Sequence, residues 1–348
     1  MEKAVSSFRK IFITSVTTLI VLTVFSASAR DVEEVNVYSA RKRELIDPLL
    51  KEFSGKTGIK VNLLTGKDDA LIKRLQSEGK ASPADLLITV DAGRLYRATE
   101  ADLLQPVNDE TLTSSVPENL REENYHWYGL SVRARPIFYV KDAVDPQQLS
   151  SYEALADDKW KGRICIRSSG NIYNQSLVGS LITANGIDAT QKWADNLVRN
   201  FARPPAGGDT DQLRAAAAGV CDIAIANTYY YGRLAKSSKA DDKNVVEKLA
   251  IFWPNQADRG VHINVSGIGL TKNARNKANA IELMKFLVSP KAQAWYAQVN
   301  SEYPVVRETS VDPVLNSWGP FKSDDLSLSV LGKNNTAAVK LMDRAGWK

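Results

Sequence analysis

Apolar and polar residues alternate in two different rhythms along the first third of the chain. EVNVYSA at 34–40 reads as a strand, and PADLLITVD at 83–91 has the nearly continuous apolar run that is typical of a strand buried on both faces. Longer stretches with apolar residues every three or four positions, such as RELIDPLLKEFSGKTG at 43–58, predict amphipathic helices. The strand-like runs are 34–40, 59–66 and 83–91, and the helix-like runs are 43–58, 68–79 and 92–104. Strands that alternate with helices of this length predict βαβ units and a parallel sheet.

The middle of the chain repeats this alternation. It contains strand-like runs at 162–169 and 220–227 and helix-like runs at 171–186, 187–201 and 210–219. The second strand leads into NTYYYGRL at 227–234, so three consecutive tyrosines stand at the C-terminal end of a predicted parallel strand. In open α/β sheets, ligands bind at this edge of the sheet. The tyrosines are therefore candidates for a binding site.

Two long extended segments separate the two α/β series. WYGLSVRARPIFYV at 127–140 comes between them, and VHINVSGIGLTKNA at 261–274 comes after the second. A chain that passes out to a second lobe and returns would use such a pair of segments as a hinge. We therefore expect an α/β protein of two lobes with a cleft between them. The first lobe is expected to comprise 30–131 and 267–348, and the second 132–266.

The N-terminus has the layout of a secretory signal peptide. Positive residues precede an apolar stretch at 11–25, and the small residues Ala27, Ser28 and Ala29 follow it. The apolar stretch is shorter than the roughly 20 residues that a membrane-spanning helix needs. We expect residues 1–29 to be removed and the mature protein to be exported and soluble, with an uncleaved anchor as the alternative.

Composition and charge exclude several kinds of function. The formal net charge of +5 is mild and its basic residues are scattered, which argues against nucleic-acid binding. His126 and His262 are the only histidines, so the usual zinc sites and a Ser-His-Asp triad lack support. No Walker or GxGxxG motif occurs. We expect a binding protein and not an enzyme.

The two cysteines, Cys165 and Cys221, both lie in short strand-like apolar runs. In an oxidising compartment an even pair indicates a disulfide. The alternative is two small buried thiols on neighbouring strands.

Tyrosines mark several of the predicted strand ends. Tyr38 closes the first strand, Tyr173 follows the strand that contains Cys165, and the triplet begins at Tyr229. Phenolate is a hard anionic oxygen donor that ionises at neutral pH only beside strong positive charge. A tyrosine-rich, histidine-poor site fits Fe(III) better than Zn(II), Cu(I) or Mg(II). The alternative is that these aromatic rings merely fill an interface.

The sequence resembles the periplasmic ferric-ion-binding proteins of bacterial ABC importers, which belong to the transferrin-like class of solute-binding proteins. The similar segments span nearly the whole mature chain, and they are VNVYSAR, PADLLITVDAGRL, GLSVRARPIFYV, GRICIRSSGNIYNQSLVGSLI and CDIAIANTYYYGRL. The resemblance implies a two-lobed type II binding-protein fold whose lobes are joined by crossing strands and close over Fe(III).

The resemblance also implies which residues hold the metal. By position, Tyr38, Tyr173, Tyr229 and Tyr230 would coordinate iron, and Tyr231 would point elsewhere. Judged by spacing alone, Tyr230 and Tyr231 remain an alternative pair of metal ligands.

Two arginines match family positions beside the metal. Arg133 in SVRARP and Arg233 in YYYGR would balance phenolate charge or hold a carbonate-like anion. The alternative for each is an ordinary surface charge.

The function implied is capture of ferric iron in the periplasm by a monomer that delivers it to a membrane permease with its ATPase. The alternative keeps the fold and changes the solute to a polyamine, thiamine, sulfate or phosphonate. A polyamine site would need several carboxylates with aromatic walls that stay un-ionised.

Overall fold

The computed structural model describes residues 33–348, which contain two β-sheets. The expected signal peptide at 1–29 lies outside the described residues. Within 33–348, no helix combines the length and the apolar character that crossing a membrane requires. The expected α/β class with two sheets is confirmed.

The first sheet has the strand order β11-β5-β10-β3-β1-β2, and β4 pairs with β10. Its strands are β1 (Glu34–Ser39), β2 (Lys60–Thr65), β3 (Leu86–Val90), β4 (Leu104–Gln105), β5 (Tyr128–Ala134), β10 (Ile263–Thr271) and β11 (Tyr303–Pro304). As predicted, β1 runs parallel to β2 and β3, whereas β10 runs antiparallel to both β3 and β5. β3 (LLITV) is almost wholly apolar, as expected for a strand with both faces covered, and every residue of β10 is buried.

We call the first sheet and its helices the first half of the fold, and the second sheet and its helices the second half. The helices of the first half are α1 (Arg43–Thr57), α2 (Asp68–Glu78), α3 (Ala92–Glu100), α4 (Glu110–Ser115), α10 (Lys277–Leu287) and α11 (Pro290–Asn300). α1 buries Ile46, Leu49, Leu50 and Phe53, which share one face at helical spacing. It ends at Gly58, whose φ of 76° is the left-handed conformation that glycine adopts without steric cost.

The second sheet has the order β7-β8-β6-β9. Its strands are β6 (Ile137–Val140), β7 (Ile164–Cys165), β8 (Ile223–Ile225) and β9 (Leu249–Phe252), and its helices are α5 (Ile172–Asn185), α6 (Ile187–Arg199), α7 (Asp209–Ala217), α8 (Thr228–Ala235) and α9 (Ala240–Lys248). β7 and β8 are parallel, as the sequence pattern predicts. The structure joins Cys165 and Cys221 in a disulfide, which links β7 to the segment that leads into β8.

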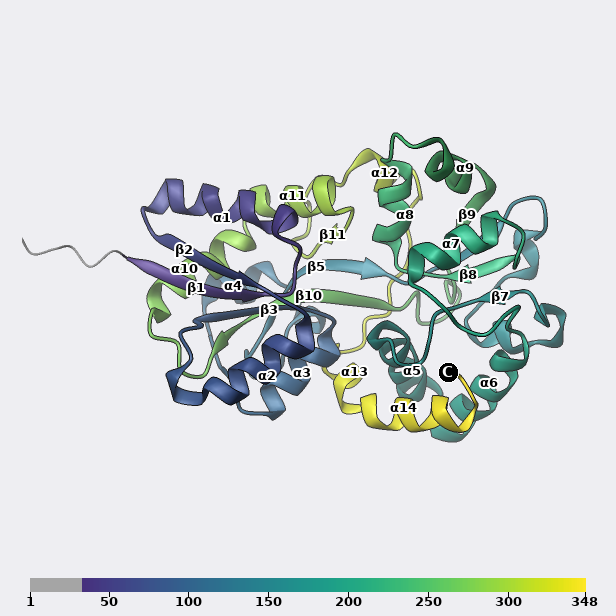
Figure 1. Ribbon diagram of the computed structural model, residues 1–348, viewed down its shortest axis with the longest axis horizontal. Helices are drawn as coiled ribbons and strands as arrows, with labels where there is room; N and C mark the ends of the chain where they lie inside the picture. The colour runs from purple at the N-terminus through teal and green to yellow at the C-terminus, as the bar shows by residue number, and fades with distance from the viewer. Residues whose placement is uncertain (1–32) are drawn as a thin grey trace, which may run out of the picture. The chain divides into compact units, whose positions relative to one another are not determined.

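Two connections carry the chain between the sheets (Figure 1). β5 of the first sheet passes through Arg135 and Pro136 into β6 of the second. β9 of the second sheet returns through residues 253–262 to β10 of the first, and β5 and β10 pair with each other. The two extended segments seen in the sequence therefore form the crossing strands.

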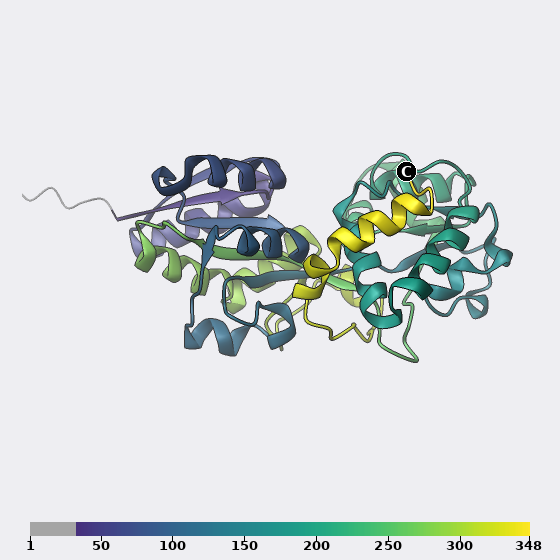
Figure 2. The ribbon, with the colours of Figure 1, turned by 90° about the horizontal axis from the view of Figure 1, so that it is seen from below.

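The C-terminal segment contributes to both halves. It contains α12 (Pro313–Asn316), α13 (Ser329–Lys333) and α14 (Asn335–Arg344). α13 packs on α3 and α5, and α14 packs on α5 and α6 (Figure 2). This differs from the expectation that 267–348 completes the first lobe, because α14 lies against helices of the second half. The lobe boundaries themselves remain a prediction.

His262 provides a test of stability against pH. It lies directly before β10 and is 3% exposed. Burial, followed by the charges of Arg135, Arg259 and Arg133, lowers its pKa to about 3. The unfolded chain takes up this proton below a pH of about 6.5 and the folded chain does not, so stability should fall by up to about 1.4 kcal/mol per pH unit between about 6.5 and about 3.

Urea unfolding of the wild type and of His262→Gln at a series of pH values measures this dependence. The variant is expected to lose less stability on acidification than the wild type. Equal losses in the two proteins would show that His262 titrates normally in the folded state.

Candidate metal centre

Two helix starts bring the middle tyrosines to one edge of the second sheet. α8 begins directly after β8, so Tyr229 and Tyr230 lie in its first turn. α5 follows β7, and the side chain of Asn171 caps it by accepting a hydrogen bond of 3.1 Å from the Tyr173 N–H. Because β7 and β8 are parallel neighbours, their C-terminal ends lie at the same edge. Phenols that are 56 residues apart in sequence therefore meet.

Three of the four predicted metal ligands are brought together. The Tyr229 hydroxyl donates to the Tyr173 hydroxyl across 3.1 Å. The rings of Tyr229 and Tyr230 lie 4.2 Å apart between centroids. Tyr229 is 5% exposed and Tyr230 is half-buried. We call Tyr173, Tyr229 and Tyr230 the tyrosine cluster.

Tyr231 points away from the tyrosine cluster. Its hydroxyl donates to the backbone carbonyls of Val246 and Leu249, at 3.1 and 2.9 Å. Its ring packs against Phe138 and Trp318. The orientation implied by the resemblance is the one observed, and a pair of Tyr230 and Tyr231 at one site does not fit these contacts.

Tyr38 is placed differently from the other predicted ligands. It is 3% exposed, and its hydroxyl lies 3.0 Å from each carboxylate oxygen of Glu78. The guanidinium of Arg74, which also bonds Glu78, lies 5.3 Å from the centre of the Tyr38 ring. In the part of the chain that the structure describes, the hydroxyl of Tyr38 is bonded to α2 and not to the tyrosine cluster.

The electrostatics of the tyrosine cluster favour neutral phenols when no cation is near. Burial raises the pKa of Tyr173 and of Tyr229 well above the usual value. Next in effect is charge on a neighbouring phenol, which raises both pKa values. The charge of Arg133 lowers both, and the hydrogen bond from Tyr229 also lowers the pKa of Tyr173. Two or three phenolates can thus form together only if a cation arrives to compensate their charge.

Arg133 is a buried cation with unused donors. It lies on β5, is 2% exposed, and its Nη2 donates to the Ser266 hydroxyl at 2.8 Å. Its Nε and Nη1 are buried and have no hydrogen-bond partner among the described residues. Buried donors are nearly always paired in folded proteins, so these two N–H groups indicate a site for an acceptor.

Arg233, the second arginine that the resemblance implied, is exposed on α8. Its guanidinium carbon lies 4.9 Å from the ring centre of Tyr229 and 5.6 Å from that of Tyr230. It therefore packs on the faces of two cluster rings, which places positive charge beside them.

A buried network that the sequence analysis did not identify supports the tyrosine cluster. Asp209 is fully buried, and its Oδ2 accepts from Arg135 Nη1 at 2.9 Å and from the Asn227 N–H at 2.7 Å. Its Oδ1 accepts from Arg167 Nη1 at 3.3 Å. Both guanidinium groups lie near the Tyr173 ring, with centroid distances of 6.0 and 5.5 Å. One carboxylate thus orients charges beside Tyr173 and the start of α8.

Arg41 is a further buried cation that the sequence analysis did not identify. Its Nη2 donates to Glu302 at 2.7 Å and to Ser131 at 2.6 Å, and its Nε has no partner among the described residues. The pKa of Arg41 is raised, despite burial, by Glu302, Tyr296 and Tyr229. The available signal was its position two residues after the end of β1, at a predicted strand end.

Histidines, cysteines and carboxylates offer no rival metal site in residues 33–348. No group of three or more of these side chains is placed there to hold an ion. His126 Nδ1 lies 2.9 Å from Glu122, and His262 is buried.

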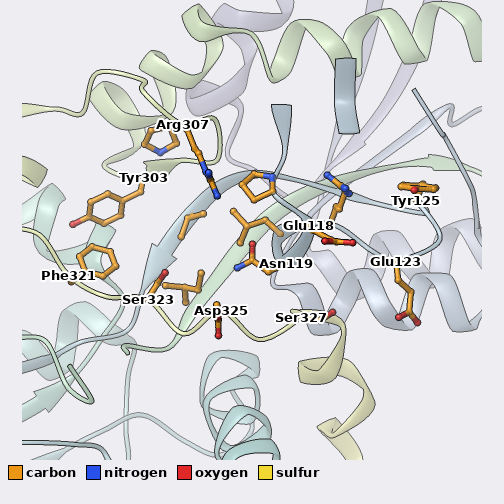
Figure 3. A pocket seen from close by; sticks show the side chains of 16 residues that line it. Glu118, Asn119, Glu123, Tyr125, Tyr303, Arg307, Phe321, Ser323, Asp325 and Ser327 are labelled. Atoms are coloured by element: carbon orange, nitrogen blue, oxygen red, sulfur yellow. The ribbon is translucent and has the colours of Figure 1, made fainter. Parts of the chain in front are cut away.

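A cavity of about 890 Å³ lies elsewhere in the fold (Figure 3). It is lined by Val132 and Ile263 of the crossing strands, and by residues that include Tyr303, Phe321 and Arg307. None of the four predicted ligand tyrosines lines it. It is therefore distinct from the tyrosine cluster.

The chain is similar to a family of solute-binding proteins and to iron-binding members of known sequence and structure. Residues 48–322 match the family described as bacterial extracellular solute-binding protein. The chain is 49% identical over 316 residues to iron uptake protein A1 of Synechocystis sp., covering 91% of this chain and 88% of that protein. It is 27% identical to the major ferric iron-binding protein of Neisseria meningitidis, over 96% of this chain and 99% of the relative. Among solved structures, the Trichodesmium protein IdiA (FutA) in complex with iron and citrate superposes with a TM-score of 0.89 at 52% identity, covering 90% of this chain and 100% of that one.

Proposed function

Because this chain belongs to the bacterial extracellular solute-binding protein family, we propose that it captures ferric iron outside the cytoplasmic membrane for import into the cell. Relatives that share about half of its residues over nearly the whole chain include an iron uptake protein and a protein solved in complex with iron and citrate. A protein of this class binds its cargo and releases it, and the proposal includes no chemical reaction.

The observation that carries the proposal is the tyrosine cluster. Two phenol oxygens 3.1 Å apart, with the ring of Tyr230 packed against that of Tyr229, offer hard oxygen donors at one point. Fe(III) is the cation that such donors suit, because its charge can displace the phenol protons. Zn(II) or Cu(I) would be better served by imidazole or thiolate.

We assign the metal to Tyr173, Tyr229 and Tyr230. Tyr38, the fourth ligand implied by the resemblance, could join them only if its hydroxyl left Glu78. The unused N–H groups of Arg133 support a carbonate-like anion as a further ligand, since a planar oxyanion would satisfy both donors. Arg233 would offset the remaining phenolate charge from the ring faces.

Delivery completes the proposed function. Iron ligands on α5 and α8 and charged groups on the crossing strands would favour the closed arrangement of the two halves once iron is bound. A membrane permease with a separate ATPase would then take the loaded protein as its substrate.

Titration of the metal-free protein with ferric citrate tests the proposal. A visible phenolate-to-iron charge-transfer band should develop and saturate at one iron per chain. Protein that stays colourless, but is stabilised against heat by a polyamine, thiamine, sulfate or phosphonate, would instead support the alternative solute.

Removing the charge of Arg133 is expected to weaken iron binding. Arg133→Gln keeps a polar side chain near Ser266 and loses the cation, so the ferric affinity should fall by about 10- to 100-fold, the usual cost of losing a group that supports metal ligands. Competition with a ferric chelator measures the change. Ser266→Ala removes the bond and leaves the charge, so it should cost less. Unchanged affinity and spectrum in Arg133→Gln would place Arg133 outside the site.

A further inference from the structure

Asp91 forms a buried hydrogen-bonded junction between the two halves of the fold. It follows β3 and caps α3, and its Oδ1 accepts from the Gly93 N–H at 2.8 Å. The same oxygen accepts from the Ser176 hydroxyl on α5, also at 2.8 Å. Its Oδ2 accepts from the side-chain amide of Asn264 on β10 at 2.8 Å. Asp91 and Ser176 are both fully buried.

The backbone at Asp91 indicates that this particular side chain is needed. Its φ is 83°, a conformation that residues other than glycine rarely adopt. Glycine would adopt this backbone more readily, but it has no carboxylate to join α3, β10 and α5. A strained residue that is this fully bonded is typical of a functional position.

The junction lies next to the helix that carries Tyr173. Ser176 is three residues after Tyr173 on α5, so the two side chains share one face of the helix. The two halves also approach closely here, because a Cβ on Gly93 would meet Asp91 Oδ1 at 3.1 Å, Ile172 at 3.6 Å and Ser176 Oγ at 3.7 Å. A shift of α3 or of Asp91 would therefore displace the first turn of α5.

The same junction is also bonded to the strand that pairs with the strand of Arg133. Asn264, which donates to Asp91, stands directly opposite Arg133 in the pairing of β10 with β5. The side-chain oxygen of Asn264 also accepts from the Ala92 N–H at 2.8 Å, so both the oxygen and the nitrogen of its amide are hydrogen-bonded. Asp91 thus connects the helix of Tyr173 with the strand pair of Arg133.

We propose that Asp91 is a positioning residue for the metal centre, which acts through Ser176 to hold the Tyr173 phenol at a fixed place relative to Arg133. This inference rests on the proposed iron ligands and adds a residue that touches neither the metal nor its anion. The bond joins groups that are 85 residues apart, one at the start of α3 and the other on α5.

Ser176→Ala tests the inference, because it removes the donor to Asp91 and little else. Ser180→Ala is the matched control: Ser180 is a buried serine on the same helix whose hydroxyl bonds the Leu177 carbonyl within α5. Ferric affinity is measured by competition with a chelator, and the charge-transfer band reports the ligand geometry. Ser176→Ala should bind Fe(III) about tenfold more weakly with a shifted band, in the range found for groups that orient metal ligands. Ser180→Ala should change neither quantity, and Ser176→Thr, which retains a hydroxyl, should restore the band.

Three outcomes would overturn the inference. Ser176→Ala with wild-type affinity and band, in a protein that loses iron when Tyr173 is replaced by phenylalanine, would leave the ligands standing and refute the role of Asp91. Equal losses in Ser176→Ala and Ser180→Ala would assign the effect to helix packing. If Tyr173→Phe itself binds iron normally, the proposed ligand set is wrong and the inference is rejected with it.

Discussion

Replacing Tyr229 with phenylalanine is expected to lower the affinity for Fe(III) by more than about a hundredfold, because groups that only support metal ligands already cost 10- to 100-fold. Tyr229 is buried, its hydroxyl bonds that of Tyr173, and its ring packs on Tyr230. The substitution removes one oxygen and keeps the ring, so the fold should persist. The charge-transfer band should also weaken. Chelator competition and visible spectra measure both effects.

The neighbouring residue supplies a close control. Tyr231→Phe removes an adjacent hydroxyl that is bonded to the carbonyls of Val246 and Leu249. It should lower stability by about 1 kcal/mol, the usual net value of a buried hydrogen bond, and leave iron affinity unchanged. If Tyr231→Phe abolishes binding and Tyr229→Phe does not, the assignment of the tyrosines must be reversed.

The second large expected effect is a steep loss of iron affinity on acidification. Burial raises the pKa of Tyr173 and Tyr229 far above neutrality, so both phenols carry their protons throughout the range from about pH 5 to about pH 8. Binding must expel one proton for each phenolate formed, and each proton makes the apparent affinity tenfold weaker per unit fall in pH. Three phenolates predict a decrease of about a thousandfold per pH unit.

The slope can be measured by competition with a chelator whose own protonation is known. Tyr173→Phe should reduce the slope by about one proton, that is, to about a hundredfold per pH unit. A wild-type affinity that is independent of pH would mean that the phenols do not ionise on binding, and iron ligation by phenolate would then be rejected.

The sequence pattern predicted the elements of the fold because each rests on local periodicity. The apolar runs at 34–40, 59–66 and 83–91 correspond to β1, β2 and β3, and the tyrosines at 173 and 229 follow β7 and β8 as expected. The extended segments at 127–140 and 261–274 were likewise recognisable from local sequence, and they contain the paired crossing strands β5 and β10. The edge of a sheet at which a residue lies can thus be predicted from the sequence.

The direction of a side chain at that edge could not be predicted in the same way. Successive residues of a strand face opposite sides of the sheet, so Tyr38 and its neighbours at the end of β1 can face different surroundings. Tyr38 reaches Glu78, which is 40 residues further along the chain on α2. A contact of that kind depends on tertiary packing, for which a single sequence carries no local signal.

The polar network around the tyrosine cluster is also long-range. Asp209 meets Arg135 across 74 residues, and Arg41 meets Glu302 across 261. The sequence analysis assigned no role to the charged residues at these positions. Their burial depends on the tertiary fold and is seen only in the structure.

The disulfide has a consequence for when the metal centre becomes complete. Tyr173 follows Cys165 by eight residues, and Tyr229 follows Cys221 by eight residues. The disulfide therefore joins the two polypeptide segments at the same number of residues before each tyrosine. It prevents one segment from sliding along the other. Cysteines stay reduced in the cytosol and pair after export, so a chain that captures iron outside the cytoplasmic membrane, as proposed, would acquire this restraint only in the compartment where it meets the metal.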